Sequence, residues 1–177
     1  MQDSSEANTA RAFRDPRQFA FVPVLEAEFE AILAELGALE RESFEASPDS
    51  LSIAARGYDE RGWRAYALFG ADPRCAAHRA RCPRTARACA AVPRMVNAGF
   101  SMFWPGTQLY PHRGELAGIL RCHLPLIVPQ GDLGLRSGAD TRVWKPGKCL
   151  IFDDTIEHEA WNRTDSDRVV LIVTFEP

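Results

Sequence analysis

Residues 99–128 read GFSMFWPGTQLYPHRGELAGILRCHLPLIV, and this stretch decides the fold class. Short runs of aromatic and aliphatic residues alternate in it with turns that contain proline or glycine. The same pattern continues in WKPGKCLIFDDTIEHEAWN at residues 144–162 and in RVVLIV at residues 168–173. Many short strands at close spacing are typical of a barrel or of two packed sheets. The sequence therefore predicts a mainly β fold with flanking helices, of the jelly-roll or cupin-like kind.

The N-terminal half of the chain has helical patterns instead. After Pro23, apolar residues recur at helical spacing with glutamates between them, namely Leu25, Phe29, Ile32, Leu33 and Leu36. This spacing buries one face of a helix and leaves the other face in water. A second, alanine-rich helix is predicted to begin near Thr85 and to end at Pro93.

The chain has 177 residues, which is enough for one domain with a sizeable core. Residues 1–18 are expected to form a flexible N-terminal arm, as chain ends commonly do. Residues 19–177 are then a single domain. Its helical part covers about residues 19–98 and its β part about residues 99–177.

The composition argues against several classes of function. A formal net charge of −3 gives no sign of a nucleic-acid partner. The sequence has neither the apolar region of a signal peptide nor an apolar run of roughly 18 residues, so a membrane partner is not expected. Five cysteines without CxxC spacing favour neither structural zinc nor a disulfide framework. We therefore expect a cytoplasmic protein with reduced thiols, and the sequence does not indicate its oligomeric state.

Candidate chemistry lies in the β part of the chain, which holds three of the four histidines. Because side chains alternate along a strand, Arg121 and His123 are predicted to share one face and to build a polar pocket. Arg168 begins the last strand, and a buried arginine calls for a planar anion such as a carboxylate. Imidazoles of His112 and His158 suit Zn, Cu, Fe or Ni.

Each of these residues also has a structural interpretation. A histidine at a strand end is commonly a hydrogen-bonded structural residue, and an arginine in a final strand is usually on the surface. Asp153 and Asp154 follow a strand, where aspartates often form turns. The spacing of the residues alone does not select an oxygenase.

The ordered series of motifs resembles the aspartyl/asparaginyl β-hydroxylase family of Fe(II)/2-oxoglutarate-dependent oxygenases. The matching segments are FSMFWPGTQLYPHRG, LRCHLPLIVP, WKPGKCLIFDDTIEHEAWN and RVVLIV. The resemblance extends weakly upstream, through residues 61–63 and residues 82–85, and so covers most of the chain. It implies a double-stranded β-helix as the fold.

The resemblance also implies the metal ligands. His112 matches the first iron ligand in its H-x-G setting, and His158 matches the second. Most enzymes of this chemistry add a carboxylate, but Gly114 at the matching position offers no side chain. The resemblance implies that water fills this place. Asp154, four residues before His158, is expected to hydrogen-bond that water, and direct ligation by Asp154 is the competing geometry. A related variant, the halogenases, would place chloride there.

Residues around the co-substrate follow in the same way. Arg168 matches the arginine that pairs with the distal carboxylate of 2-oxoglutarate, and Ser101 matches a serine that assists it. Arg121 and His123 match residues around the other end of 2-oxoglutarate. The expected cofactors are thus Fe(II), 2-oxoglutarate as co-substrate and O2.

The expected function is a dioxygenase that hydroxylates an unactivated C–H bond. The resemblance favours the β-carbon of an Asp or Asn residue, or a related small amino acid or peptide intermediate. The family's substrate-binding arginine corresponds to Ile119, so Arg61, Arg64 or Arg113 is the candidate replacement. The alternatives are a cupin-type isomerase or hydrolase that uses the same metal, and a non-enzymatic metal-binding barrel.

Overall fold

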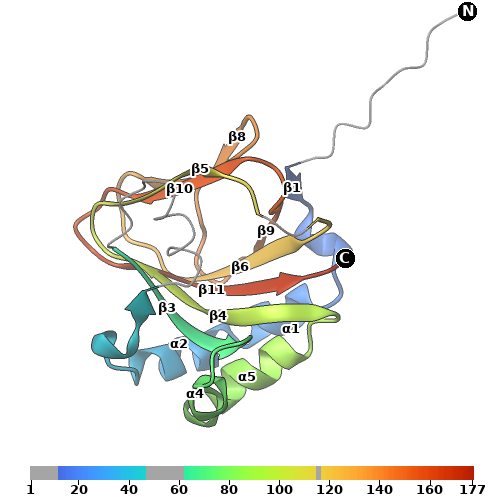
Figure 1. The fold of residues 1–177 in the computed structure, drawn as a ribbon, viewed down its shortest axis with the longest axis vertical. Coiled ribbons are helices and arrows are strands. Elements are labelled where there is room, and N and C mark those ends of the chain that lie inside the picture. The colour runs from blue at the N-terminus through green and yellow to red at the C-terminus, as the bar shows by residue number, and fades with distance from the viewer. Residues whose placement is uncertain (1–11, 47–61, 115–116) are drawn as a thin grey trace, which may run out of the picture.

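The computed structural model describes residues 12–46, 62–114 and 117–177. Two antiparallel sheets face each other, and the helices cover the outer face of the larger one (Figure 1). Among the described residues, the larger sheet has the strand order β1-β9-β6-β11-β4-β3-β2 and the smaller has β5-β10-β7-β8. This is the mainly β, double-stranded β-helix fold that the sequence predicts. The strands are β1 Phe13–Arg14, β2 Glu45–Ala46, β3 Trp63–Phe69, β4 Met95–Phe103, β5 Thr107–His112, β6 Leu120–Ile127, β7 Leu133–Ser137, β8 Asp140–Arg142, β9 Leu150–Asp153, β10 His158–Asn162 and β11 Arg168–Phe175.

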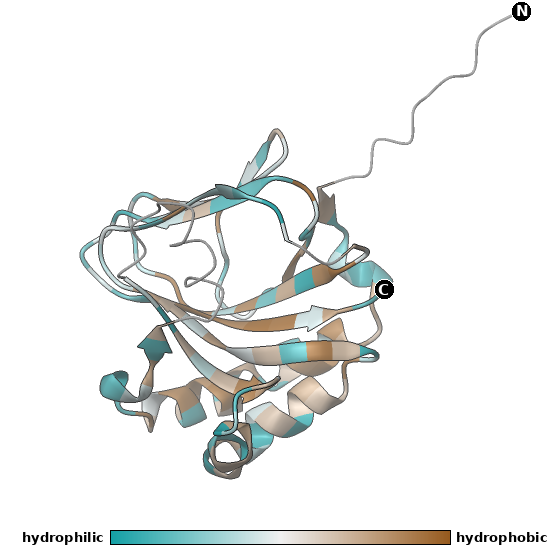
Figure 2. Ribbon diagram, viewed as in Figure 1, coloured by the Kyte–Doolittle hydropathy of each residue, from teal (hydrophilic) through white to brown (hydrophobic). Residues whose placement is uncertain are grey.

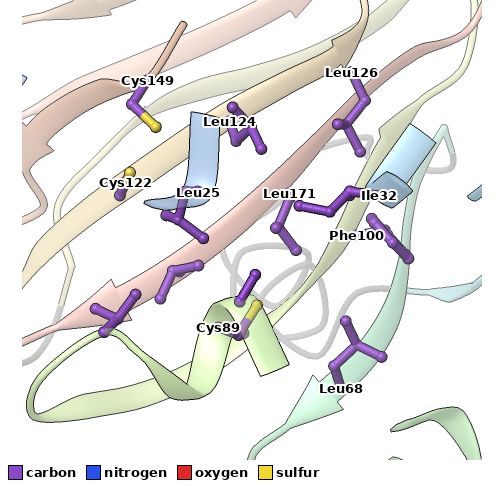
Figure 3. Close-up of a cluster of buried hydrophobic side chains, with 14 of the residues drawn as sticks. Leu25, Ile32, Leu68, Cys89, Phe100, Cys122, Leu124, Leu126, Cys149 and Leu171 are labelled. Atoms are coloured by element: carbon purple, nitrogen blue, oxygen red, sulfur yellow. The ribbon is translucent and has the colours of Figure 1, made fainter. Parts of the chain in front are cut away.

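The α-helices pack on the outer face of the larger sheet and close one hydrophobic core. They are α1 Val22–Ala27, α2 Phe29–Gly37, α4 Cys75–Arg81 and α5 Pro83–Ala90, with short 3-10 helices η1 Pro16–Gln18 and η2 Arg41–Ser43. Leu25 and Ile32 from the helices meet Leu124 and Leu171 from the sheet (Figure 3). Hydrophobic residues run along the strands at this interface (Figure 2). Within the described part of the chain, no helix has the length and apolar character that a membrane crossing needs.

The alternation predicted for β6 is confirmed. Leu120, Cys122 and Leu124 belong to the core under the helices, whereas Arg121 and His123 line a cavity on the opposite face. Since β6 lies between β9 and β11, both of its edges are paired and its inward side chains are held at fixed positions.

A second hydrophobic core lies on the inner face of the larger sheet. Trp63, Phe103 and Trp144 belong to it, and Leu109 and Leu135 from the smaller sheet complete it. These large side chains fill only part of the space between the sheets. The remaining space is the central cavity described below.

The N-terminal half differs from the sequence-based expectation. Residues Phe13 and Arg14 of the expected arm form β1, because the Phe13 side chain is buried in the second core. The expected helix around residues 25–36 is two helices that meet at Glu28. The expected helical part also contains the strand β3, paired to β4. Tertiary pairing thus overrides the local pattern in these segments.

Candidate metal and anion-binding site

A central cavity of ≈ 220 Å³ lies between the two sheets. Polar side chains from both sheets enter it, and apolar residues such as Phe152 and Leu135 complete its wall. The polar and charged residues that line it are Asn97, Ser101, His112, Arg113, Arg121, His123, Asp154, His158, Arg168 and Thr174. The structure therefore brings together seven of the residues to which the sequence assigned catalytic or cofactor-binding roles.

His112 and His158 form a pair of imidazoles at one end of the cavity. They occupy opposed positions on β5 and β10, and their ring centroids are 4.2 Å apart. His112 Nδ1 lies 2.8 Å from the Tyr110 carbonyl oxygen, and His158 Nδ1 lies 2.8 Å from that of Ile156. A carbonyl only accepts hydrogen bonds, so each Nδ1 carries the proton and each Nε2 keeps its lone pair.

The charge state of His158 also suits metal binding. Burial, reinforced by the neighbouring His112, lowers the pKa of His158 to about 3. The ring is therefore neutral at pH 7, as a metal ligand has to be. The backbone carbonyls fix the orientation of both rings, which is the usual role of groups behind a metal ligand.

Asp154 occupies the space beside Gly114. The Gly114 amide donates a 2.7 Å hydrogen bond to the Asp154 carbonyl, and a Cβ at position 114 would collide with the Asp154 carboxylate. The carboxylate oxygen Oδ1 lies 2.7 Å from Arg121 Nε and 3.5 Å from His158 Nε2. A carboxylate thus stands near the two imidazoles, although it comes from the loop before β10 and not from position 114.

Arg168 is a buried cation at the other end of the cavity, with 1% of its surface exposed. Its guanidinium lies 3.7 Å from the ring centroid of Phe103 and 4.7 Å from that of Trp144. Nη1 donates to the Ser101 carbonyl over 3.3 Å, while Nε has no hydrogen-bond partner in the part of the chain that the structure describes. Burial lowers the pKa of Arg168 to about 9, so the group is still charged at pH 7. Among the described residues no carboxylate pairs with it, so the cavity offers this cation to an anionic ligand.

His123 is a buried hydrogen-bond donor that faces the same space. The Trp144 indole donates to His123 Nδ1 over 3.2 Å. Burial and the nearby Arg168 hold the pKa of His123 well below its usual value. The neutral ring must therefore carry its proton on Nε2, which is buried and has no partner among the described residues. Ser101 is positioned similarly, since its Oγ accepts a 3.0 Å hydrogen bond from the Trp63 indole.

The three arginines proposed as substrate contacts have different positions. Arg113 lines the mouth of the cavity and donates to the Thr155 carbonyl over 3.1 Å. The Arg64 guanidinium stacks on Trp104 at 4.4 Å and is not part of the cavity wall. Arg61 lies outside the described residues. Of the two that the structure describes, Arg113 lines the cavity and Arg64 does not.

Two tryptophans at the site were not identified by the sequence analysis: Trp63, which lines the cavity, and Trp144, which packs against His123 and Arg168. Each indole donates a hydrogen bond to a polar residue of the cavity, Trp63 to Ser101 and Trp144 to His123. A tryptophan near a strand end has the same sequence signature whether it fills a core or orients a polar group. No local signal could have separated the two possibilities.

Comparison with known proteins gives a consistent family. The model of the family described as "Aspartyl/Asparaginyl beta-hydroxylase" matches residues 26–177. The ornithine lipid ester-linked acyl 2-hydroxylase of Rhizobium tropici is 39% identical over 166 residues, which are 91% of this chain and 59% of that protein. The aspartyl/asparaginyl beta-hydroxylase of Mus musculus is 43% identical over 74 residues, which are 42% of this chain and 10% of that protein. The chain thus spans well under two thirds of the length of both relatives.

A solved structure supports the fold. HygX from Streptomyces hygroscopicus, crystallised with nickel and 2-oxoglutarate bound, aligns with a TM-score of 0.58 and 14% identity. The alignment covers 86% of this chain and 79% of HygX. At this identity the likeness concerns the fold, whereas the family follows from the match to most of the sequence. The chain belongs to the aspartyl/asparaginyl β-hydroxylase family.

Proposed function

We propose that this chain is an Fe(II)- and 2-oxoglutarate-dependent dioxygenase that hydroxylates an unactivated C–H bond. One observation carries the proposal: a buried Arg168, which has no carboxylate partner among the described residues, shares a cavity with the imidazole pair of His112 and His158. An enzyme that holds a metal and a dicarboxylate together needs these two features in one place. Membership of a hydroxylase family supports the same reaction type.

His112 and His158 would hold the iron through their Nε2 atoms. When bound, Fe(II) with O2 and 2-oxoglutarate supplies the oxidation: one oxygen atom enters the substrate C–H bond as hydroxyl, and the other enters succinate as CO2 leaves. The protein contributes position and exclusion of water. The apolar residues Phe152 and Leu135 keep the surroundings of the imidazoles dry.

Arg168 and the Ser101 hydroxyl would bind the distal carboxylate of 2-oxoglutarate. A carboxylate at this place satisfies the unpartnered Arg168 Nε, and the planar guanidinium suits a bidentate contact. His123 and Arg121 would contact the keto-acid end, His123 as a neutral donor through Nε2. Bound 2-oxoglutarate would therefore give Arg168 Nε and His123 Nε2 hydrogen-bond partners. It would also add a contact to Ser101 and to Arg121.

Asp154 would act as a positioning residue and not as a ligand. Its carboxylate is already engaged by Arg121 at 2.7 Å, and it faces the two imidazoles across the space that Gly114 leaves open. There it can accept a hydrogen bond from a water molecule. The same negative charge disfavours chloride at this place, which supports hydroxylation over halogenation.

Two substrate classes are supported by the relatives. The mouse relative's name indicates an Asp or Asn side chain in a protein, and Arg113 at the cavity mouth suits the carboxylate of such a substrate or of a free amino acid. The R. tropici relative acts on an acyl chain, as its name states, and is similar to this chain over a greater length. In both classes the reaction is oxidation of an aliphatic C–H bond.

The alternative functions, a metal-dependent isomerase and a non-catalytic metal-binding barrel, would use fewer of the residues in the central cavity. A metal-dependent isomerase with the same histidines would gain nothing from a buried cation that lacks a partner. A metal-binding barrel without catalysis would not need the two donors that face the cavity. The positions of Arg168 and His123 therefore favour the oxygenase.

The test is an anaerobic titration of the Fe(II)-reconstituted protein with 2-oxoglutarate, followed by its visible charge-transfer absorption. We expect a saturable band in the parent, no band in His112→Ala, and at least tenfold weaker affinity in Arg168→Ala. The exposed Arg87 on α5 provides the matched control, and Arg87→Ala should titrate as the parent does. A parent protein that binds iron but gives no band would refute the proposal.

A further inference from the structure

A second hollow of ≈ 240 Å³ lies on the inner face of the larger sheet. We call it the side groove and define it by Ala65, Ala67, Phe69, Gly99 and Ile172. It crosses from β11 over β4 to β3, the strand near the edge of the sheet. It shares residues with the central cavity, namely Trp63, Asn97, Ser101, Arg121 and Ile172. The side groove is therefore a lateral extension of the central cavity.

Small residues at neighbouring inward positions hollow out this groove. Ala67 on β3 pairs with Gly99 on β4, and Ala65 pairs with Ser101. A Cβ at Gly99 would lie 2.6 Å from the Tyr66 carbonyl oxygen, so the close approach of the two strands requires glycine there. Trp63 and Phe103 stand at the end of the same two strands, so the larger side chains begin where the groove stops.

The walls of the groove offer few hydrogen bonds to a ligand: Asn97 and Ser101 are its uncharged polar side chains apart from Trp63, and Ser101 Oγ already accepts from the Trp63 indole. The backbone of β4 is paired on both sides, by β3 and by β11. The Ala67 carbonyl, on the far side of β3, is already 2.7 Å from His78 Nδ1. A peptide laid in this groove would bury amide groups without hydrogen-bond partners, which is unfavourable. An unbranched hydrocarbon chain has no such groups to satisfy.

Charge is confined to the two ends of the groove. Arg121 stands where the groove meets the central cavity and is engaged by Asp154. Asp72 stands at the other end, where its carboxylate is bonded to Arg74. The middle is aliphatic and aromatic, which is the environment that favours burial of methylene groups.

We infer that the side groove binds the unbranched aliphatic chain of the substrate, with the reacting carbon at the end that joins the central cavity. This inference rests on the proposed function and narrows its substrate class to an acylated molecule. The depth of the groove depends on Ala65 and Ala67, which are partly exposed and therefore determine how much chain can enter.

The test uses the metal-free protein and neutral n-alkanols from hexanol to dodecanol, which do not compete for Arg168. Binding is followed by tryptophan fluorescence, since Trp63 lines the groove. We expect affinity to rise about fourfold for each added methylene until the groove is full. Ala67→Leu and, separately, Ala65→Leu should lower the affinity for the longer alkanols at least tenfold. Ala77→Leu, an exposed position on α4, is the matched control and should leave it unchanged.

The charge-transfer titration with 2-oxoglutarate is repeated on the same variants. Parent-like titration by Ala67→Leu and Ala65→Leu, together with lost alkanol affinity, supports the side groove and shows that the variants fold. Equal alkanol binding by parent and Leu variants, or no dependence on chain length, overturns it. If the parent gives no band but alkanol binding remains sensitive to Ala67→Leu, the oxygenase proposal falls and the groove remains as a binding site.

Discussion

Burial of the charged Arg168 guanidinium lowers the stability of the folded protein, and its proposed role in binding a carboxylate explains why a cation is placed there. Burial disfavours its charge by several kcal/mol, as the lowering of its pKa from 12.5 to about 9 indicates. Stacking on Phe103 and Trp144 offsets about 1–2 kcal/mol of this unfavourable free energy. We therefore predict that Arg168→Met raises the free energy of unfolding of the metal-free protein by about 1–3 kcal/mol. Urea denaturation measures this change, and the same variant should bind 2-oxoglutarate at least tenfold more weakly.

The comparison with Arg168→Lys separates charge from shape. Lysine keeps a buried cation but loses the planar fork and its stacking, so this variant should be less stable than the methionine variant. A methionine variant less stable than the parent would mean that the guanidinium contacts outweigh its desolvation. In that case the cation would be a structural element of the core.

Trp144 acts on the co-substrate through His123. Its indole fixes the His123 tautomer by one hydrogen bond and its ring covers Arg168. Trp144→Phe keeps the ring but removes the N–H group, so the proton of His123 is free to move to Nδ1. We predict a three- to tenfold loss of 2-oxoglutarate affinity, about 1 kcal/mol for one hydrogen bond, and a changed His123 tautomer in ¹⁵N NMR spectra. Trp161→Phe removes a comparable bond to Asp132 outside the cavity and should change neither quantity.

Helix α5 depends on a cap that comes from another element. The Glu35 carboxylate on α2 accepts the backbone N–H groups of Arg84 and Thr85, each at 2.8 Å, and the Thr85 hydroxyl at 2.7 Å. Glu35→Ala leaves these first-turn donors without an acceptor. We predict a loss of about 1–3 kcal/mol in the free energy of unfolding, measured by thermal denaturation.

This loss should leave the site intact, because α2 and α5 cover the face of the larger sheet that is turned away from the central cavity (Figure 1). Glu30→Ala, an exposed position on the same helix, is the matched control and should change stability by less than about 0.5 kcal/mol. Weakened 2-oxoglutarate binding in Glu35→Ala at low temperature would show that the helices and the site are coupled.

The elements that the sequence predicts well are those with a polar and an apolar face. In β6, Arg121 and His123 alternate with buried aliphatic residues, so both the strand and its inward face follow from the pattern. In β3, whose sequence is WRAYALF, the residues do not alternate between polar and large apolar side chains. Ala65 and Ala67 line the side groove at positions where a large inward residue would be expected. The strand is recognisable only from its pairing with β4.

Contacts between distant parts of the molecule determine those features of the site that local sequence patterns do not predict. Most of the residues that enter the central cavity were identifiable from strand alternation and family resemblance, since their polar side chains are placed by β4, β5, β6, β10 and β11. The role of Asp154 beside Gly114 and the hydrogen bonds of Trp63 and Trp144 arise from contacts between distant segments. The side groove likewise requires two strands in register. Such features follow from tertiary packing and have no signature along the chain.

The buried imidazoles of His158 and His123 determine how the free energy of unfolding of the whole molecule changes at acidic pH. The pKa of His158 lies at about 3 and that of His123 well below its usual 6.5, in both cases chiefly because of burial. Below pH 6.5 the unfolded chain therefore takes up protons that the folded protein does not. As the pH drops below 6.5, the free energy of unfolding of the metal-free protein should fall by up to about 1.4 kcal/mol per pH unit for each imidazole.

Denaturation by urea at pH 7, 6 and 5 tests this prediction. Carboxylates such as Asp153, whose pKa is lowered from 3.8 in the folded protein, reduce the free energy of unfolding only when the pH falls to about 4. The interval between pH 7 and 5 therefore isolates the effect of the imidazoles. His123→Gln cannot take up the proton and should show about half of the parental slope. A flat profile in the parent over this interval would mean that the two rings take up protons as readily in the folded protein as in the unfolded chain, so that neither imidazole is held neutral by its buried surroundings.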